Sequence, residues 1–376
     1  MKVLIAGELP SEIADGLEVF GLDVVTRPDV TTDSLPDAIG ETDILVVGDM
    51  GVSRRALERA ERLLLIVRAG EGLERVDVGV ASERAVFVSH CPGHDAAAKA
   101  EHALGELIRL DRAGSARGLA RRTLGLCGFN STAAILTRAA TALGMTVHAY
   151  APDVTDGLAS EMAVRRSRSM EELLSHCDVV SLHPGDSWAP EFGSETLALL
   201  ADEAIVLAAE GVRGLDLAEL TSFLKKGNVR VSIDQQPSEL NQEEQELLEK
   251  LSRSKSVTVS REAGATLHAT QRAAAEVVRI VHGFLHEGAV ANCVNTIAQS
   301  DAACTLVVKH RHETAVLAEV IDVLRDEDVG LREIRNTLFQ DASAAHTHLR
   351  LVARPGQTVL DRLRRKESIF DVSVDM

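Results

Sequence analysis

Short runs of consecutive apolar residues alternate, along the first ninety residues, with segments in which apolar residues recur every three or four positions. The first pattern predicts buried β-strands and the second predicts amphipathic helices. The expected strands are residues 3–6, 22–25, 44–47, 64–67 and 86–88. Helical spacing behind a serine cap predicts helices at residues 11–20 and 53–62. Near-continuous apolar strands separated by helices are typical of a parallel sheet that is covered on both faces.

A second series of strands and helices begins after a long helix, rich in alanine and leucine, that we expect at residues 95–116. The expected strands are residues 123–127, 146–150, 179–182, 204–207, 230–233 and 256–259. The expected helices are residues 132–143, 170–175, 216–226 and 243–251. This alternation predicts a second parallel sheet, with a glycine-bearing turn directly after its first strand.

The pattern changes after a further long helix, expected at residues 267–286, and a polar linker at residues 292–300. The elements that follow are a strand at 304–309, a helix at 314–326, strands at 330–339 and 346–352, a helix at 359–366 and a strand at 370–374. A βαββαβ order predicts a ferredoxin-like unit. The predicted fold class is therefore α/β, with two parallel-sheet domains, flavodoxin-like and Rossmann, and a smaller ferredoxin-like domain.

Composition narrows the classes of function. The net charge of −17 argues against a nucleic-acid partner. The sequence contains no run of about 18 apolar residues, so it predicts no membrane span. Five scattered cysteines in apolar contexts predict buried free thiols in a reducing compartment, so we expect a cytoplasmic protein. His90 and His94 have a spacing that metals can use, but two ligands on a loop do not make a metal site, and we expect none.

The turn after the first strand of the second sheet is the main candidate for cofactor binding. A dinucleotide-binding turn has glycines at three positions, which here hold Gly128, Asn130 and Ala133. Asn130 tolerates left-handed dihedral angles, so the turn can persist, but its side chain threatens the close approach of a phosphate. Ser131 and Thr132 offer hydroxyls that either contact a phosphate or, as we favour, cap the following helix.

Four segments together resemble the D-3-phosphoglycerate dehydrogenases, within the D-2-hydroxyacid dehydrogenase family. Residues 68–77 look like the substrate loop of that family, and residues 92–102 are similar to the start of its interdomain helix. Residues 177–183 resemble the strand before its cofactor loop, and residues 292–295 resemble a linker. The resemblance implies a substrate-binding-type domain from residues 1–97 and 267–297. It also implies a Rossmann domain at 98–266 and an ACT-like regulatory domain at 302–376.

The resemblance further implies an NAD(H)-dependent oxidoreductase of serine biosynthesis that forms a homodimer or homotetramer. Its partner is a small-molecule substrate or effector. The substrate would meet Arg68, Gly70 and Arg75, and the ribose of the cofactor would meet an acidic residue after the second strand. That position holds Ala151, and Asp153 is the nearest carboxylate.

The positions that the resemblance marks as catalytic hold unexpected residues. The carboxylate-orienting arginine of the family stands in an Arg-Gly pair, where this chain has Glu210 and Gly211. We favour this substitution over a slipped loop in which Arg213 serves. Glu262 stands where the family has its general acid-base histidine.

The acidic partner of that histidine does match as Glu239, because Glu239 keeps the expected spacing from Asp234 on the preceding strand, which the resemblance marks as cofactor-binding. His268, one turn into the next helix, is a possible replacement base, although a lone helical histidine is usually structural. The expected cleft thus combines several acidic and several basic side chains, namely Asp49, Glu71, Glu210, Glu239, Glu262, Arg68, Arg75, Lys99 and Arg261.

Three hypotheses follow from these observations. The leading one is a phosphoglycerate-dehydrogenase-like protein whose diverged catalytic site is weak or inactive, because the base, the carboxylate-orienting group and the ribose-binding group all depart from expectation. The second is an active NAD-dependent oxidoreductase that acts on a D-2-hydroxy acid such as 3-phosphoglycerate. The third is a non-catalytic protein that senses a ligand in the cleft and regulates through the C-terminal domain.

Overall fold

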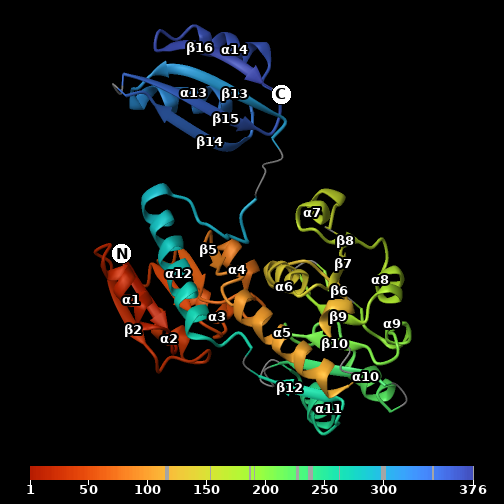
Figure 1. Cartoon of the computed structure of the whole chain (residues 1–376). Helices are drawn as coiled ribbons and strands as arrows, with labels where there is room; N and C mark the ends of the chain where they lie inside the picture. The colour runs from red at the N-terminus through yellow and green to blue at the C-terminus, as the bar shows by residue number, and fades with distance from the viewer. Residues whose placement is uncertain are drawn as a thin grey trace. The chain divides into compact units, whose positions relative to one another are not determined.

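The computed structural model (Figure 1) describes residues 1–114, 118–152, 154–185, 188–189, 191–225, 228–235, 240–261, 263–297, 302–340 and 343–375. The chain divides into two compact units, Met1–Asn295 and Thr296–Met376. The larger unit contains two parallel sheets, and the smaller unit contains one antiparallel sheet. The α/β fold class predicted from the hydrophobic pattern is confirmed.

The first sheet has five parallel strands in the order β2-β1-β3-β4-β5, which is the flavodoxin-like order. Its strands are β1 (Lys2–Ala6), β2 (Asp23–Arg27), β3 (Ile44–Val47), β4 (Leu65–Arg68) and β5 (Phe87–His90). Its early helices are α1 (Ser11–Glu18), α2 (Leu35–Ala38), α3 (Arg54–Arg59) and α4 (Val78–Glu83). The strands β3 and β4 are buried throughout, as continuous apolar runs predict for a sheet covered on both faces.

One face of this sheet is covered by a helix from much later in the chain, α12 (Leu267–Glu287). Val277 and Ile280 of α12 are buried in one core with Val3 and Ile5 of β1. The helices α1 and α12 approach so closely that a Cβ atom on Gly16 would lie 2.6 Å from Cγ2 of Val278. The first domain is therefore built from two separate stretches of sequence.

The second sheet has seven parallel strands in the order β12-β11-β10-β9-β6-β7-β8. The order reverses between β6 and β9, as in a Rossmann fold. Its strands are β6 (Thr123–Cys127), β7 (Thr146–Tyr150), β8 (Arg165–Arg166), β9 (Val179–Leu182), β10 (Ile205–Ala208), β11 (Arg230–Asp234) and β12 (Val257–Ser260). Its helices are α5 (Ala96–Ala113), α6 (Ser131–Ala142), α7 (Asp156–Glu161), α8 (Met170–His176), α9 (Ser194–Leu197), α10 (Leu217–Phe223) and α11 (Gln242–Ser252), with a 3-10 turn at Leu119–Arg121.

Two hydrophobic cores lie on opposite faces of this sheet. One joins α5 and α6 to β6 and β7, with Leu107 and Leu136 at its centre. The other packs α8, α10 and α11 against β9, β10 and β11. The helix α5 follows β5 of the first sheet and precedes β6 of the second, so it connects the two sheets of the larger unit (Figure 1).

The smaller unit has the elements β13 (Cys304–Arg311), α13 (Thr314–Asp326), β14 (Leu331–Leu338), β15 (Ala344–Leu351), α14 (Gln357–Arg364) and β16 (Ile369–Asp375). All its strand pairs are antiparallel, in the order β14-β15-β13-β16. This is the βαββαβ ferredoxin-like arrangement that the sequence predicts. Both helices contribute apolar side chains to the single core of this unit.

The differences from the predicted elements are confined to short segments. The helices α2, α4, α7 and α9 span four to six residues, which is too short for a helical period to appear in the sequence. The strand β8 consists of two exposed arginines and has no apolar pattern at all. The five cysteines are free, and all but Cys293 are buried, as expected.

The turn after β6 requires a glycine at position 128. Gly128 has a φ of +99°, and a Cβ atom there would lie 1.7 Å from the carbonyl oxygen of His183. We predict that Gly128→Ala lowers the free energy of unfolding by at least about 2 kcal/mol, from backbone strain and overpacking together. Urea unfolding measures this change.

Gly288→Ala is the matched control, because Gly288 also has a positive φ (+63°) but faces open space. The control variant should lose only about 1 kcal/mol. Equal losses in the two variants would show that the contact with His183 is unimportant.

Candidate functional site

The carboxyl ends of the strands of both sheets line one cleft. Asp49 follows β3 and Arg68 ends β4, while His183 and Glu210 follow β9 and β10. Two adjoining cavities, of about 1270 Å³ and 720 Å³, lie at the ends of β3, β4 and β10. The residues common to both cavities include Asp49, Arg68, Glu71, Lys99 and Glu210. In open α/β sheets, ligands bind beyond the carboxyl ends of the strands, where the strand order reverses.

A buried carboxylate lies at the centre of the cleft. The side chain of Glu210 is 8% exposed, and its Oε1 atom lies 2.5 Å from Nδ1 of His183. Its Oε2 atom accepts a hydrogen bond of 2.6 Å from Nδ2 of Asn130. These contacts join the turn after β6 to the residues that follow β9 and β10. Nε2 of His183 is buried and has no hydrogen-bond partner within the described part of the chain.

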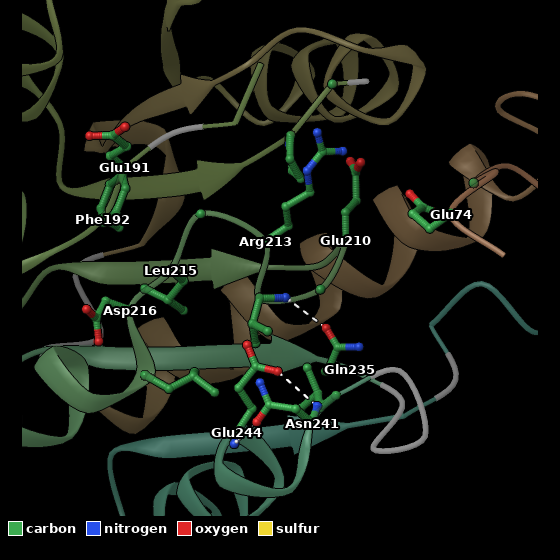
Figure 2. Close-up of a pocket in the computed structure, with 18 of the residues that line it drawn as sticks. Glu74, Glu191, Phe192, Glu210, Arg213, Leu215, Asp216, Gln235, Asn241 and Glu244 are labelled. Carbon is green, nitrogen blue, oxygen red and sulfur yellow. Dashed lines mark hydrogen bonds between the residues drawn. The ribbon is translucent and has the colours of Figure 1, made fainter. Parts of the chain in front are cut away.

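The backbone around Glu210 is fixed by its neighbours. Gly211 has a φ of +89°, which lets the chain turn sharply after β10. The Val212 amide donates a hydrogen bond of 2.9 Å to Oε1 of Gln235, as Figure 2 shows. Glu210 and Arg213 both line the larger cavity, and Figure 2 shows them projecting toward the same side of it. Glu210 is thus set by a tight turn, three residues before Arg213.

The phosphate-binding turn of the fold is altered by the side chain of Asn130. Asn130 is the N-cap of α6, with an extended backbone (φ −113°), and its Oδ1 atom accepts a hydrogen bond of 3.1 Å from the Ala133 amide. The expectation that Ser131 or Thr132 caps this helix is wrong, because the helix begins at Ser131 and the chain is extended one residue earlier. Thr132 and Ala133 are buried in the helix packing.

Lys99, on α5, places a positive charge among three carboxylates. Its Nζ atom lies 2.9 Å from Oδ2 of Asp95 and 3.9 Å from Oε2 of Glu71. Glu210 also attracts it electrostatically. Oδ1 of Asp95 is buried without a hydrogen-bond partner among the described residues. One ammonium group therefore attracts three acidic side chains at once.

The pKa values in this cluster follow from burial and charge together. Burial favours the neutral form of Glu210, but His183, Lys99 and Asn130 outweigh it and hold the pKa of Glu210 below its ordinary value. Burial also favours neutral Lys99, yet Asp95, Glu210 and Glu71 raise the pKa of Lys99. For Glu71, burial and the nearby charges of Asp95 and Glu210 raise the pKa despite the attraction of Lys99. The carboxylate of Glu71 is therefore less compensated than that of Glu210.

Arg68 and Arg75 approach the same loop from the first sheet. The guanidinium of Arg68 donates to the carbonyl oxygen of Gly72 and pairs with Oδ1 of Asp49 at 2.5 Å. Nε of Arg68 has no hydrogen-bond partner in the described chain, whereas Arg75 donates to the backbone oxygen of Asp49 at 3.1 Å. Gly70, the third expected substrate residue, lines the smaller cavity with Arg68.

Asp234 lines the smaller cavity, but both its oxygens already have partners. Oδ1 accepts a hydrogen bond of 2.7 Å from the Ser260 hydroxyl, and Oδ2 accepts one of 3.0 Å from the Ala263 amide. The Ser260 hydroxyl also lies 2.9 Å from Nε2 of His102. Asp234 therefore connects β11 to the segment after β12.

Several residues expected in the site are not brought into it or not described. Asp153, Glu239 and Glu262 lie outside the described residues. His268 is exposed near the start of α12 and is absent from the lining of both cavities. Among the described residues, no group of three or more side chains is arranged to hold a metal ion. In the same residues, we find no helix with the length and apolarity that a bilayer crossing requires.

The sequence interpretation did not select His183 or Gln235 as site residues. Both directly follow strands that flank β10, namely β9 and β11. The carboxyl ends of neighbouring parallel strands meet at one edge of a sheet. The position directly after each predicted strand could therefore have identified both residues as site candidates.

Comparisons with known proteins identify relatives of the larger unit. The model of the family described as "D-isomer specific 2-hydroxyacid dehydrogenase, catalytic domain" matches residues 3–295. D-3-phosphoglycerate dehydrogenase of Methanocaldococcus jannaschii is 28% identical over 254 residues, covering 62% of this chain and 48% of the relative. The Mycobacterium bovis enzyme of the same name is 30% identical over 260 residues, covering 61% and 47%. The matches thus span about half the length of these relatives.

Solved structures show the same fold. NAD+-bound 3-phosphoglycerate dehydrogenase of Entamoeba histolytica superposes with a TM-score of 0.68 at 21% identity, covering 79% of this chain and 99% of that one. The Escherichia coli D-lactate dehydrogenase gives a TM-score of 0.64 at 19% identity, covering 78% and 100%. At these identities the likeness establishes the architecture alone.

The buried contacts of Glu210 predict a pH-dependent stability. Since the pKa of Glu210 is lowered in the folded state, its ionisation stabilises the fold above the ordinary carboxyl pKa of 4.5, and this contribution is lost as pH falls through the lower folded value. We predict that Glu210→Gln lowers the free energy of unfolding by roughly 1.5–3 kcal/mol at neutral pH. Urea unfolding at neutral and acidic pH should show that the difference from wild type shrinks below pH 4.5.

Glu191→Gln is the control, because Glu191 lines the larger cavity but is exposed. It should change the free energy of unfolding by less than about 0.5 kcal/mol. A pH-independent loss in the Glu210 variant would contradict an ionised Glu210 in the folded state.

Proposed function

The chain belongs to the D-isomer specific 2-hydroxyacid dehydrogenase family, and we propose that it is a phosphoglycerate-dehydrogenase-like member with a diverged active site. In this proposal, NAD-dependent oxidation of a 2-hydroxy acid is weak or absent. The observation that carries the proposal is the contact between Asn130 and Glu210, because it joins the altered phosphate turn to the altered substrate position.

The residues of the phosphate turn do not fit the pyrophosphate of a dinucleotide. In Rossmann folds the absent side chain of the middle glycine lets the pyrophosphate approach the backbone at a helix N-terminus. Here the side chain of Asn130 accepts a hydrogen bond from the Ala133 amide and donates one to the carboxylate of Glu210. A phosphate at this turn would therefore lose a donor and meet a negative charge.

The substrate side of the cleft supports the same proposal. Family resemblance places a cation where Glu210 stands, next to the carboxylate of a 2-hydroxy acid. Glu210 is held ionised by His183 and Lys99, so it repels a carboxylate at that position. The proton-transfer group is also replaced, because Glu262 occupies the position of the family histidine.

Two observations favour a competing function, an active NAD-dependent oxidoreductase that acts on a D-2-hydroxy acid such as 3-phosphoglycerate. Arg213 lines the same cavity as Glu210 and supplies a cation three residues later. The relatives from Methanocaldococcus jannaschii and Mycobacterium bovis are named D-3-phosphoglycerate dehydrogenases. This function requires that Asn130 and Glu210 rearrange when a dinucleotide binds.

The C-terminal unit supports a regulatory contribution. Its βαββαβ arrangement is ferredoxin-like, and we propose that it is an ACT-like domain, which serves a cytoplasmic homodimer or homotetramer by sensing a small-molecule effector. In the purely regulatory alternative, the cleft of the larger unit has lost catalysis altogether and acts as a second sensor.

NADH titration separates these functions. We predict that the wild-type chain gives little change in NADH fluorescence and no turnover of 3-phosphohydroxypyruvate. Asn130→Gly combined with Glu210→Arg should bind NADH at least about tenfold more tightly, since both the donor and the positive charge are restored. Fluorescence titration measures the dissociation constants.

Ser131→Gly is the matched control, because it alters the same turn and leaves the Asn130 side chain in place. It should not improve NADH binding. Tight binding and turnover by the wild-type chain would refute the diverged-site proposal and establish the active oxidoreductase.

A further inference from the structure

The smaller cavity has an excess of carboxylates that its own cations do not balance. Glu71, Asp95 and Glu210 line it around the single ammonium group of Lys99. Acidic side chains gathered in a partly buried cavity destabilise one another unless a cation compensates them. The other cations of the lining are Arg68, which is engaged with Asp49 and the carbonyl oxygen of Gly72, and Arg261.

Two residues of the lining each have a buried polar atom without a hydrogen-bond partner among the described residues. Asp95 is 9% exposed, and its Oδ1 atom has no hydrogen-bond partner among the described residues, although Lys99 contacts its Oδ2 atom. Arg68 is also 9% exposed, and its Nε atom lacks a partner in the same described part of the chain. One atom is an acceptor on an anion and the other is a donor on a cation, so the two call for opposite charges in a ligand.

The surroundings of Arg68 and of Lys99 can each accommodate a charged group of a ligand. The side chain of Asp49 is 83% exposed, so it can move into solvent and leave the guanidinium of Arg68 to another carboxylate. Glu71 has a side chain that is 40% exposed and lies 3.9 Å from Lys99, so an ammonium group can pair with it from the cavity. The cavity volume of about 720 Å³ is within the range of small-molecule sites.

We propose that this cavity binds a small molecule that has both an ammonium group and a carboxylate, the chemistry of a free amino acid. The ammonium group pairs with Glu71 and Asp95 beside Lys99, and the carboxylate pairs with Arg68. The ammonium group is decisive, because the cluster around Lys99 repels a ligand that has only anionic groups. The inference rests on the proposed function, since it assumes that Glu210 has closed the cleft to 2-hydroxy acids.

The test uses the full chain without any dinucleotide. We expect that at least one of the D- and L-amino acids raises the melting temperature and binds in calorimetry. The best amino acid is then compared with its 2-hydroxy acid and with its decarboxylated amine, which share its carbon skeleton. Both analogues should bind at least about tenfold more weakly.

Variants locate the site. Glu71→Gln and Asp95→Asn should each weaken amino-acid binding about tenfold, and Glu71 is exposed enough that its variant should fold normally. Glu101→Gln, on the exposed side of the same helix as Lys99, is the matched control and should bind as the wild type does.

Three outcomes would overturn the inference: no amino acid binds, the 2-hydroxy acid binds as well as the amino acid, or the Glu71 and Asp95 variants bind normally. The last outcome would place any binding outside this cavity. Because no cofactor is present, this result is independent of NADH binding and turnover, which test the diverged-site proposal.

Discussion

The arrangement of the cleft depends on one buried carboxylate, Glu210. Burial of a negative charge is unfavourable unless hydrogen bonds and cations compensate it, and here His183 and Asn130 do so from two neighbouring strand ends. The same contacts orient the turn after β6, which is where dinucleotide-binding Rossmann folds hold a phosphate. The charge of Glu210, at the end of one strand, therefore influences the electrostatics on both sides of the cleft.

The sequence was sufficient for most of the fold, because long apolar runs and helical periods report burial directly. The flavodoxin-like, Rossmann and ferredoxin-like sheets all follow from the order of such segments. It could not reveal β8, whose two arginines are exposed, or the short helices α2, α4, α7 and α9, which complete no more than about two turns. These elements are determined by tertiary contacts rather than by a local pattern.

The candidate site was predictable only where a residue has a fixed place beside a strand end. Gly128, Asn130, Glu210 and Arg68 could be selected in this way. The partners of these residues could not, because the contact between Asn130 and Glu210 joins positions 80 residues apart. The capping role of Asn130 also escaped the sequence interpretation, since serine, threonine and asparagine are all good N-caps and only the backbone angle distinguishes them.

The packing of α12 against α1 and β1 has a consequence for synthesis on the ribosome. The first sheet begins at Lys2, yet the helix that covers one of its faces ends at Glu287, whereas the second sheet is continuous from Thr123 to Ser260. Domains generally fold as units while the chain emerges. The nascent first sheet must therefore wait, with an apolar face uncovered, while the second domain is completed. The early chain therefore exposes apolar surface, which favours aggregation, until α12 has been made.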